Sequence, residues 1–276
     1  MNKGLIALGL GLLYLYLQRE PDSHKFLSNP LKKGVRVPPN WTNVWVNDDK
    51  KAHLVATGID SKGRKQYIYS EKHVEQATKD KFKRLKSFDK ELPKIQKVIN
   101  RDAKKSEPAL ILKIIAETGF RIGSNRETKA DTKAYGASTL LGTHVKIDGS
   151  RITFDFIGKK GVRIQKTIED ETLAKLIGKK KRDGKPLFSA SDQDVRKYLD
   201  DITTKDFKVK DFRTWLGTNV ALNEISRMPV PKDKKQFTKQ RKSVGQVVAS
   251  FLGNTPSVAL SSYIAPNVFN SWEASV

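Results

Sequence analysis

The chain has 276 residues, and its 53 Lys and Arg outnumber its 30 Asp and Glu, which gives a net charge of +23. It contains no cysteine and four scattered histidines, which excludes disulfides, cysteine metal sites and thiol catalysis and disfavours a histidine metal site. So large a charge attracts phosphates and predicts salt-dependent attachment to nucleic acid. A protein that merely binds RNA or an acidic surface fits the charge equally well.

The chain opens with a hydrophobic leader, residues 1–20, whose apolar run covers residues 5–17. This run is shorter than the roughly 18–20 residues that span a bilayer, and no small-x-small cleavage site precedes Pro21. Neither a transmembrane helix nor a cleaved signal peptide is therefore expected. An uncleaved hydrophobic helix is preferred, and three roles stay open for it: a signal anchor, membrane association through residues 5–17, or docking on the protein or a partner.

The next segment, residues 21–34, is polar and punctuated by Pro and Gly, which predicts a linker. Three β-rich runs follow and predict a small twisted sheet. A basic helical stretch comes next, and it is interpreted either as a DNA contact or as the solvated face of a surface helix. A break at residues 88–93 sets the limits of two domains, residues 35–92 and 93–276. The runs are residues 41–46, 52–57 and 65–69, and the basic stretch is residues 79–86.

The second domain is predicted to be mostly helical, with a buried helix over residues 109–118. One β interruption spans residues 146–168, with turns at residues 148–149 and 158–161. The basic run at residues 179–185 is expected to form a loop. The predicted fold class is α+β, with a small, mainly β N-terminal domain and a larger, mainly α second domain.

Five residues of the second domain stand in chemically suggestive settings. Arg121 follows the apolar helix in GFRIG, Arg213 lies in KDFRTW, and Lys159 occupies the second β turn. Asn254 follows a glycine, and Tyr263 lies on a helical stretch. Each alone has a simpler explanation: a structural ion pair for either arginine, a hairpin lysine, a turn or cap asparagine, and a core tyrosine.

In this order, however, the segments resemble the type IB DNA topoisomerases, particularly the compact poxvirus-like and bacterial members. In the first domain, VPPNWTNVWV (37–46) and ATGIDSKGRKQYIY (56–69) are similar to that family's DNA-clamping domain. In the second, four segments and Tyr263 are similar to its catalytic motifs, namely YGASTL (135–140), FIGKKG (156–161), KDFRTW (210–215) and LGNTPSV (252–258). The similar stretch covers residues 35–272.

The resemblance implies the catalytic fold that tyrosine recombinases and type IB topoisomerases share, and it implies a role for each of the five residues. Tyr263 is the implied nucleophile, Arg121 and Arg213 bind the phosphate, and Lys159 is the general acid. Asn254 donates to the phosphate where poxvirus members carry His. Two guanidiniums suit the charge that develops on a phosphorane. Implied DNA contacts come from both domains: Arg64, Lys65, Gln66, Tyr67, Tyr69, Lys83, Arg84, Tyr135, Lys160 and Lys210.

The implied activity is relaxation of supercoiled duplex DNA. One strand is cleaved through a 3′-phosphotyrosyl intermediate, rotates and is religated, with no ATP, nucleotide, metal or other cofactor. A monomer is expected, because one chain carries the full set of residues. The expected compartment is cytoplasmic, at a nucleoid or a viral DNA compartment.

Three alternatives compete with this interpretation. A tyrosine recombinase shares the chemistry, but recombinases typically carry His-x-x-Arg where this chain has Lys210 three residues before Arg213. A non-catalytic DNA-binding protein of the same fold is disfavoured, because all five positions are filled. A metal-dependent nuclease would need clustered carboxylates, whereas Asp60, Asp131 and Asp211 lie in separate motifs and are interpreted as capping or solvated residues.

Overall fold

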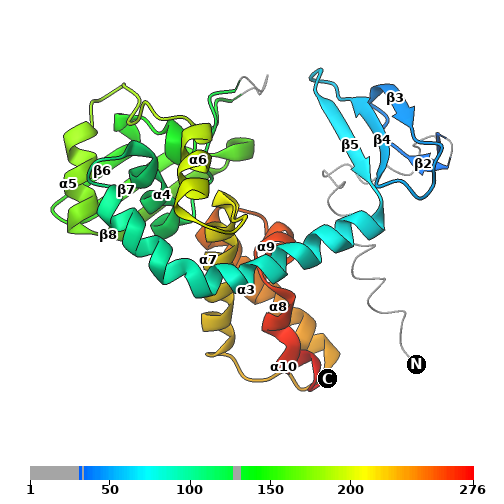
Figure 1. Ribbon diagram of the computed structural model, residues 1–276. Coiled ribbons are helices and arrows are strands. Elements are labelled where there is room, and N and C mark those ends of the chain that lie inside the picture. Colours follow the sequence, from blue (N-terminus) through cyan, green and yellow to red (C-terminus); the bar gives the residue numbers. More distant parts are fainter. Residues whose placement is uncertain (1–30, 33, 127–131) are drawn as a thin grey trace. The chain divides into compact units, whose positions relative to one another are not determined.

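The computed structural model describes residues 31–32, 34–126 and 132–276 (Figure 1). The chain divides into two compact units, Met1–Lys83 and Arg84–Val276. The hydrophobic leader and most of the predicted linker lie outside the described residues. None of the helices in the described part of the chain has the length and apolar character that crossing a bilayer requires.

The first unit is built on a three-stranded antiparallel sheet in the order β3-β4-β5, which confirms the predicted β-rich runs. A separate antiparallel pair precedes it, so the linker prediction does not hold for residues 31–32, which pair with residues 35–36. The apolar core of this unit consists of Val37, Val46, Ala56 and Ile68. The strands are β1 (Leu31–Lys32), β2 (Val35–Arg36), β3 (Thr42–Val46), β4 (Leu54–Ile59) and β5 (Lys65–Tyr69).

Helix α3 (Glu71–Asp102) runs without a break through the predicted domain limit. The break expected at residues 88–93 is therefore wrong, and the compact units divide between Lys83 and Arg84 instead of at residues 92 and 93. Pro93 is exposed within this helix and costs about 3 kcal/mol in a helix interior. Burial of Phe88, Leu92 and Ile95 offsets that cost, because each buried apolar side chain contributes about 1.5–3 kcal/mol.

The second unit combines helices with one three-stranded antiparallel sheet in the order β6-β7-β8. Both predicted turns and the predicted helix are confirmed, as is the mixed α+β fold class. The basic run at residues 179–185 is only partly a loop, because a helix ends at Lys180. The strands are β6 (Val145–Asp148), β7 (Arg151–Ile157) and β8 (Arg163–Glu169). The helices are α4 (Glu107–Thr118), α5 (Glu171–Lys180), α6 (Asp192–Ile202), α7 (Val209–Ile225), α8 (Lys234–Leu252), α9 (Pro256–Ser262) and α10 (Asn270–Glu273).

Helix α4 is the buried centre of the second unit. Ile111, Leu112, Ile114 and Ile115 have no exposed side-chain surface, so this helix is apolar on nearly every side. Ser106 caps its first turn by accepting a hydrogen bond from Ala109 N. Its end is set by Gly119 in the left-handed region, which is also the first residue of the GFRIG segment.

Candidate active site

Arg213 of α7 bridges the C-terminal ends of two helices. Its side chain is 3% exposed, and its guanidinium donates from Nη1 to Gly119 O and from Nη2 to Leu252 O. Gly119 and Gly253 are the left-handed caps of α4 and α8, with φ of 69° and 62°. Helix C-termini carry partial negative charge, so they stabilise a buried cation. A structural ion pair was the simpler explanation for a buried arginine in this motif. The described contacts of Arg213 include no carboxylate.

The charge environment of Arg213 is unusual for a guanidinium. Burial, together with the positive charge of Arg121, lowers its pKa to about 10, while Tyr263 acts in the opposite direction. Arg213 therefore stays protonated at neutral pH. Its Nε atom is buried and has no hydrogen-bond partner among the described residues. Buried donors are normally paired, so this atom is available to a ligand.

Tyr263 lies against the guanidinium of Arg213, with the Cζ atom 4.9 Å from the centre of the phenol ring. Its backbone is held by the same helix, because Thr218 of α7 donates to Tyr263 O at 3.3 Å. A β-carbon built on Gly217 would lie 2.7 Å from Tyr263 O, so only glycine allows this approach. One helix thus positions both the buried arginine and the tyrosine.

Arg121 and Asn254 are directly bonded, with Arg121 Nη2 donating to Asn254 Oδ1. Asn254 follows the cap of α8, and its backbone N–H donates to Ala249 O at 2.9 Å, as expected for a residue at a helix end. Because its side-chain oxygen is used by Arg121, the amide NH₂ is its free end. That Nδ2 atom is buried and unpartnered within the part of the chain that the structure describes.

The YGAST segment holds the backbone of the first arginine in place. Ala137 N donates to Arg121 O at 2.9 Å, and Ser138 N donates to Ile122 O at 2.7 Å. A β-carbon on Gly136 would lie 2.6 Å from Arg121 O, which explains the glycine in this motif. Tyr135 N in turn donates to Ile157 O at 2.8 Å and so ties the segment to β7.

Lys159 stands on the exposed turn between β7 and β8. The turn is closed by a hydrogen bond from Gly158 N to Val162 O at 2.8 Å. Ile164, at the start of β8, packs closely on Gly253, and a β-carbon built on Gly253 would clash with the Ile164 side chain. The hairpin is therefore anchored one residue before Asn254. The structure brings Arg121, Arg213, Asn254 and Tyr263 together, and the described contacts include none between Lys159 and those four.

Five of the six predicted DNA contacts of the first unit lie on β5 and on the turn before it, and the sixth, Lys83, lies on α3. The Tyr67 and Tyr69 rings are 50% and 41% exposed and stack with centroids 6.4 Å apart. The Nζ atom of Lys65 lies 5.7 Å from the centre of the Tyr67 ring. Arg64 and Gln66 both donate to Asp60, which therefore orders the turn. These exposed rings suit base or sugar contacts, and their binding to DNA stays a prediction.

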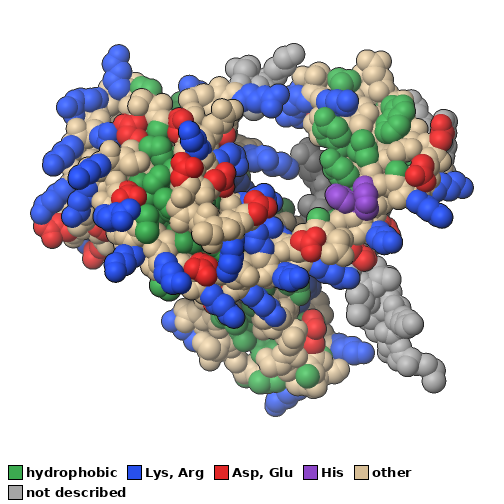
Figure 2. Space-filling view, in the orientation of Figure 1, with side chains coloured by type: hydrophobic (Ala, Val, Ile, Leu, Met, Phe, Trp, Pro, Cys, Tyr) green, Lys and Arg blue, Asp and Glu red, His purple; other side chains and the backbone are tan. Residues whose placement is uncertain are grey.

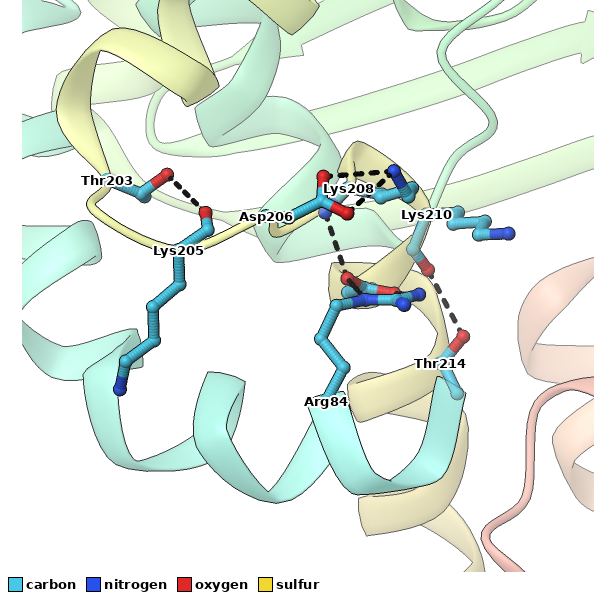
Figure 3. A network of polar contacts seen from close by, with 8 residues as sticks. Arg84, Thr203, Lys205, Asp206, Lys208, Lys210 and Thr214 are labelled. Carbon is cyan, nitrogen blue, oxygen red and sulfur yellow. Dashed lines mark hydrogen bonds and ion pairs between the residues drawn. The ribbon is translucent and has the colours of Figure 1, made fainter. Parts of the chain in front are cut away.

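Arg84, like Arg64, has a paired guanidinium, but its carboxylate partner is almost fully buried. It donates from Nε and Nη2 to the two oxygens of Asp211, at 2.8 and 3.1 Å (Figure 3). Asp211 is 1% exposed and also accepts from Lys208 N at 2.9 Å, so its buried carboxylate satisfies the backbone N–H of the N-cap residue of α7. Of the other predicted contacts of the second unit, Lys160 and Lys210 are exposed and Tyr135 is half-buried, while Lys83 of the first unit is exposed. Lys and Arg side chains cover much of the visible surface (Figure 2).

Lys166 of β8 is not among the site residues predicted from the sequence. Its Nζ atom donates to Thr118 O at 2.7 Å and lies 3.2 Å from the centre of the Phe251 ring. A signal for it exists, because Lys166 occupies the inward position between Ile164 and Ile168, where alternation predicts an apolar residue. No group of three His, Asp or Glu side chains suited to a metal ion occurs among the described residues.

Comparisons with known proteins agree with these motifs. Residues 64–271 match the model of the eukaryotic DNA topoisomerase I catalytic core, and residues 33–60 match that of the bacterial DNA topoisomerase IB N-terminal domain. DNA topoisomerase 1B of Acanthamoeba polyphaga mimivirus is 36% identical over 255 residues, which cover 83% of this chain and 75% of the relative. DNA topoisomerase 1B of vaccinia virus (strain Copenhagen) is 28% identical over 254 residues, which cover 85% and 78%. DNA topoisomerase 1 of rabbit fibroma virus is 27% identical over an alignment of 277 positions, gaps included, which covers 92% of this chain and 85% of the relative. The chain therefore belongs to the type IB DNA topoisomerase family.

Proposed function

We propose that this type IB DNA topoisomerase cleaves one strand of duplex DNA with Tyr263 as the nucleophile and reseals it after strand rotation. The observation that carries this assignment is a pair of buried donors, Arg213 Nε and Asn254 Nδ2, that have no partner among the described residues. They lie in a site where the Tyr263 ring packs on Arg213. A phosphodiester offers two non-bridging oxygens that accept such hydrogen bonds. Arg121, bonded to Asn254, adds a second guanidinium.

The reaction is a transesterification. The Tyr263 oxygen attacks the phosphorus and loses its proton, the bond to the 5′ oxygen breaks, and Lys159 supplies the proton that this leaving oxygen takes. The charge that builds up on the phosphorane is stabilised by Arg121 and Arg213, whose planar donors are already fixed before the reaction. The products are a 3′-phosphotyrosyl bond and a free 5′-hydroxyl, and attack by that hydroxyl reverses the step.

The energy of the broken strand is conserved in the phosphotyrosyl bond, so religation needs no ATP. Torsional strain in the DNA drives the rotation. We further propose that a monomer carries out the cycle, that it needs no metal or nucleotide, and that it works in the cytoplasm at a nucleoid or viral DNA compartment. Membrane association through residues 5–17 remains a separate hypothesis, because those residues lie outside the described part of the chain.

Plasmid relaxation tests the assignment. The purified chain is incubated with negatively and with positively supercoiled plasmid in EDTA without ATP, beside Tyr263→Phe and a matched control, Tyr198→Phe. Tyr198 is a half-buried tyrosine of α6 whose hydroxyl donates to Asp102 at 3.0 Å. We expect the parent and Tyr198→Phe to relax both plasmids and Tyr263→Phe to relax neither. A parent that shifts the plasmid without relaxing it would overturn the proposal.

A further inference from the structure

We propose that Lys166 is a positioning residue that holds the two helix ends from which Arg121 and Asn254 project, a role that rests on the proposed function. The Lys166 ammonium donates to Thr118 O at 2.7 Å, at the end of α4, and to Phe251 O at 3.5 Å, near the end of α8. It also lies over the Phe251 ring, 3.2 Å from its centre. Its ligands are therefore the same two helix termini that Arg213 bridges.

The two cations divide the carbonyl groups of these termini between them. Arg213 binds Gly119 O and Leu252 O, and Lys166 binds the carbonyl immediately before each of those. Each helix end thus offers two neighbouring carbonyl groups that have no partner within their own helix. One accepts from Lys166 and the other from Arg213, so each cation links the two helix ends. The distance between the ends of α4 and α8 is therefore fixed twice, once by Arg213 and once by Lys166.

The distance between the helix ends matters because Arg121 and Asn254 follow these ends directly in the sequence. Arg121 follows Thr118 by three residues, and Asn254 follows Phe251 by three residues. The hydrogen bond between them closes the gap on the substrate side. Without Lys166 the outer carbonyls lose their shared donor, the two ends are free to separate, and both phosphate-binding groups shift. A displacement of about 1 Å in such a group is enough to slow a reaction on the order of 100-fold.

Keeping the Lys166 side chain charged at this buried position is energetically unfavourable. This favours a specific role for the residue over simple packing. Burial, and then the charge of Arg213, lower its pKa to about 7. Within the described chain, Arg213 is the charged group that acts on it, while α4 and α8 present carbonyls and Phe251, and β7 presents Phe154 in the facing register position. An apolar residue at this inward position would avoid the desolvation cost altogether.

The test compares three substitutions. Lys166→Met removes the hydrogen-bond donor and keeps a side chain of similar length. Lys166→Arg keeps a positive charge that does not titrate in the range assayed. Lys146→Met is the control. Lys146 is an exposed lysine on β6 of the same sheet. Each variant is assayed for single-turnover formation of the covalent adduct on a nicked duplex, from pH 6 to about 9. Non-covalent DNA affinity is measured in a Tyr263→Phe background.

We expect Lys166→Met to slow cleavage about 10- to 100-fold at pH 6, as the loss of a supporting partner does elsewhere, with DNA affinity within about twofold of the parent. Its deficit relative to the parent should shrink as the pH rises through about 7, where the parent lysine loses its charge. Lys166→Arg should retain most of the cleavage rate. The cleavage rate of Lys166→Arg divided by that of the parent should rise over the same pH range. Lys146→Met should match the parent throughout.

A rate for Lys166→Met within twofold of the parent, or a deficit independent of pH, would overturn the assignment. So would an effect that simply adds to that of Asn254→Ala, because a positioning residue must act through the Arg121–Asn254 pair. If Lys166→Met does not fold, the pH dependence of the Lys166→Arg ratio decides alone. If the parent forms no adduct, the proposed function fails, but amide hydrogen exchange of residues 119–123 and 252–255 in Lys166→Met against the parent still tests the positioning role. Faster exchange in the variant supports that role, and equal exchange overturns it.

Discussion

Arg121 donates a hydrogen bond to the side-chain oxygen of Asn254 across 133 residues of sequence. This bond fixes which way the amide points, because the oxygen is occupied and the NH₂ group is left to donate. An amide is neutral, so Asn254 cannot supply a positive charge. The geometry shows what it supplies instead, namely an acceptor that orients Arg121 and a buried neutral donor.

Two substitutions of Asn254 separate these contributions. Asn254→Ala removes one donor to the phosphate and is expected to slow single-turnover cleavage about 100-fold. Asn254→Asp keeps the size and the acceptor but adds a negative charge beside Arg121, so it should be slower still, because the carboxylate repels the phosphate. Cleavage of a suicide duplex measures both. Equal rates for the two variants would show that the charge next to Arg121 is irrelevant.

Gly217 is predicted to be essential for the position of the nucleophile. A β-carbon there would lie 2.7 Å from Tyr263 O and 3.1 Å from Tyr263 Cβ. Gly217→Ala must therefore push Tyr263 away from Arg213, and we expect it to lower the free energy of unfolding by about 1–3 kcal/mol and to slow cleavage. Urea denaturation and single-turnover cleavage measure the two effects.

Gly178 of α5 provides the matched control for that experiment. A β-carbon at Gly178 would meet only Ile147 Cδ1, at an ordinary 3.7 Å. Gly178→Ala should therefore raise the stability by about 0.5–1 kcal/mol, because alanine has the higher helix propensity, and it should leave cleavage unchanged. A Gly217→Ala variant that behaves like this control would refute the close packing of α7 against Tyr263.

The sequence allowed prediction of features that depend on neighbouring residues. The β7–β8 hairpin was predictable because its alternating pattern ends at a glycine-rich turn. Recognisable motifs also contain the four residues that the structure brings together, Arg121, Arg213, Asn254 and Tyr263. Lys159 lies in such a motif too, but its place in the site stays a prediction. The break at Pro93 was wrong because burial of Phe88 and Leu92 depends on partners distant in sequence. The role of Lys166 was missed for the same reason, since its ligands are backbone carbonyls that no side-chain pattern marks.

The ion pair between Arg84 and Asp211 is predicted to stabilise the start of α7. Arg84→Met leaves a carboxylate that is 1% exposed without its counter-charge and should lower the free energy of unfolding by about 3–5 kcal/mol. The double variant Arg84→Met, Asp211→Asn should recover part of that loss. Lys175→Met, which breaks an exposed pair with Glu171, should cause little measurable change. Equal effects of Arg84→Met and Lys175→Met in urea denaturation would contradict the buried pair.

Glu107, at the start of α4, is predicted to make the second unit sensitive to acid. Burial opposes its ionisation, but hydrogen bonds from Lys180, Ser189 and Ala190 prevail and lower its pKa from 4.5 to about 2. The unfolded carboxyl binds protons first as the pH falls, so the stability that Glu107 contributes is complete above about pH 4.5 and is lost as the pH falls toward 2. Glu107→Gln should therefore be less stable than the parent at pH 7 by up to about 3 kcal/mol, and the difference should vanish near pH 2.

Urea denaturation at several pH values between 7 and 2.5 measures this difference, with Glu169→Gln as the control. Glu169 is 67% exposed and lies 3.6 Å from Arg151, so its pair contributes little to stability. The control should follow the parent over the whole range, while the gap between Glu107→Gln and the parent narrows below pH 4.5. A gap that stays constant with pH would mean that the Glu107 charge is not what joins the start of α4 to Ser189 and Lys180.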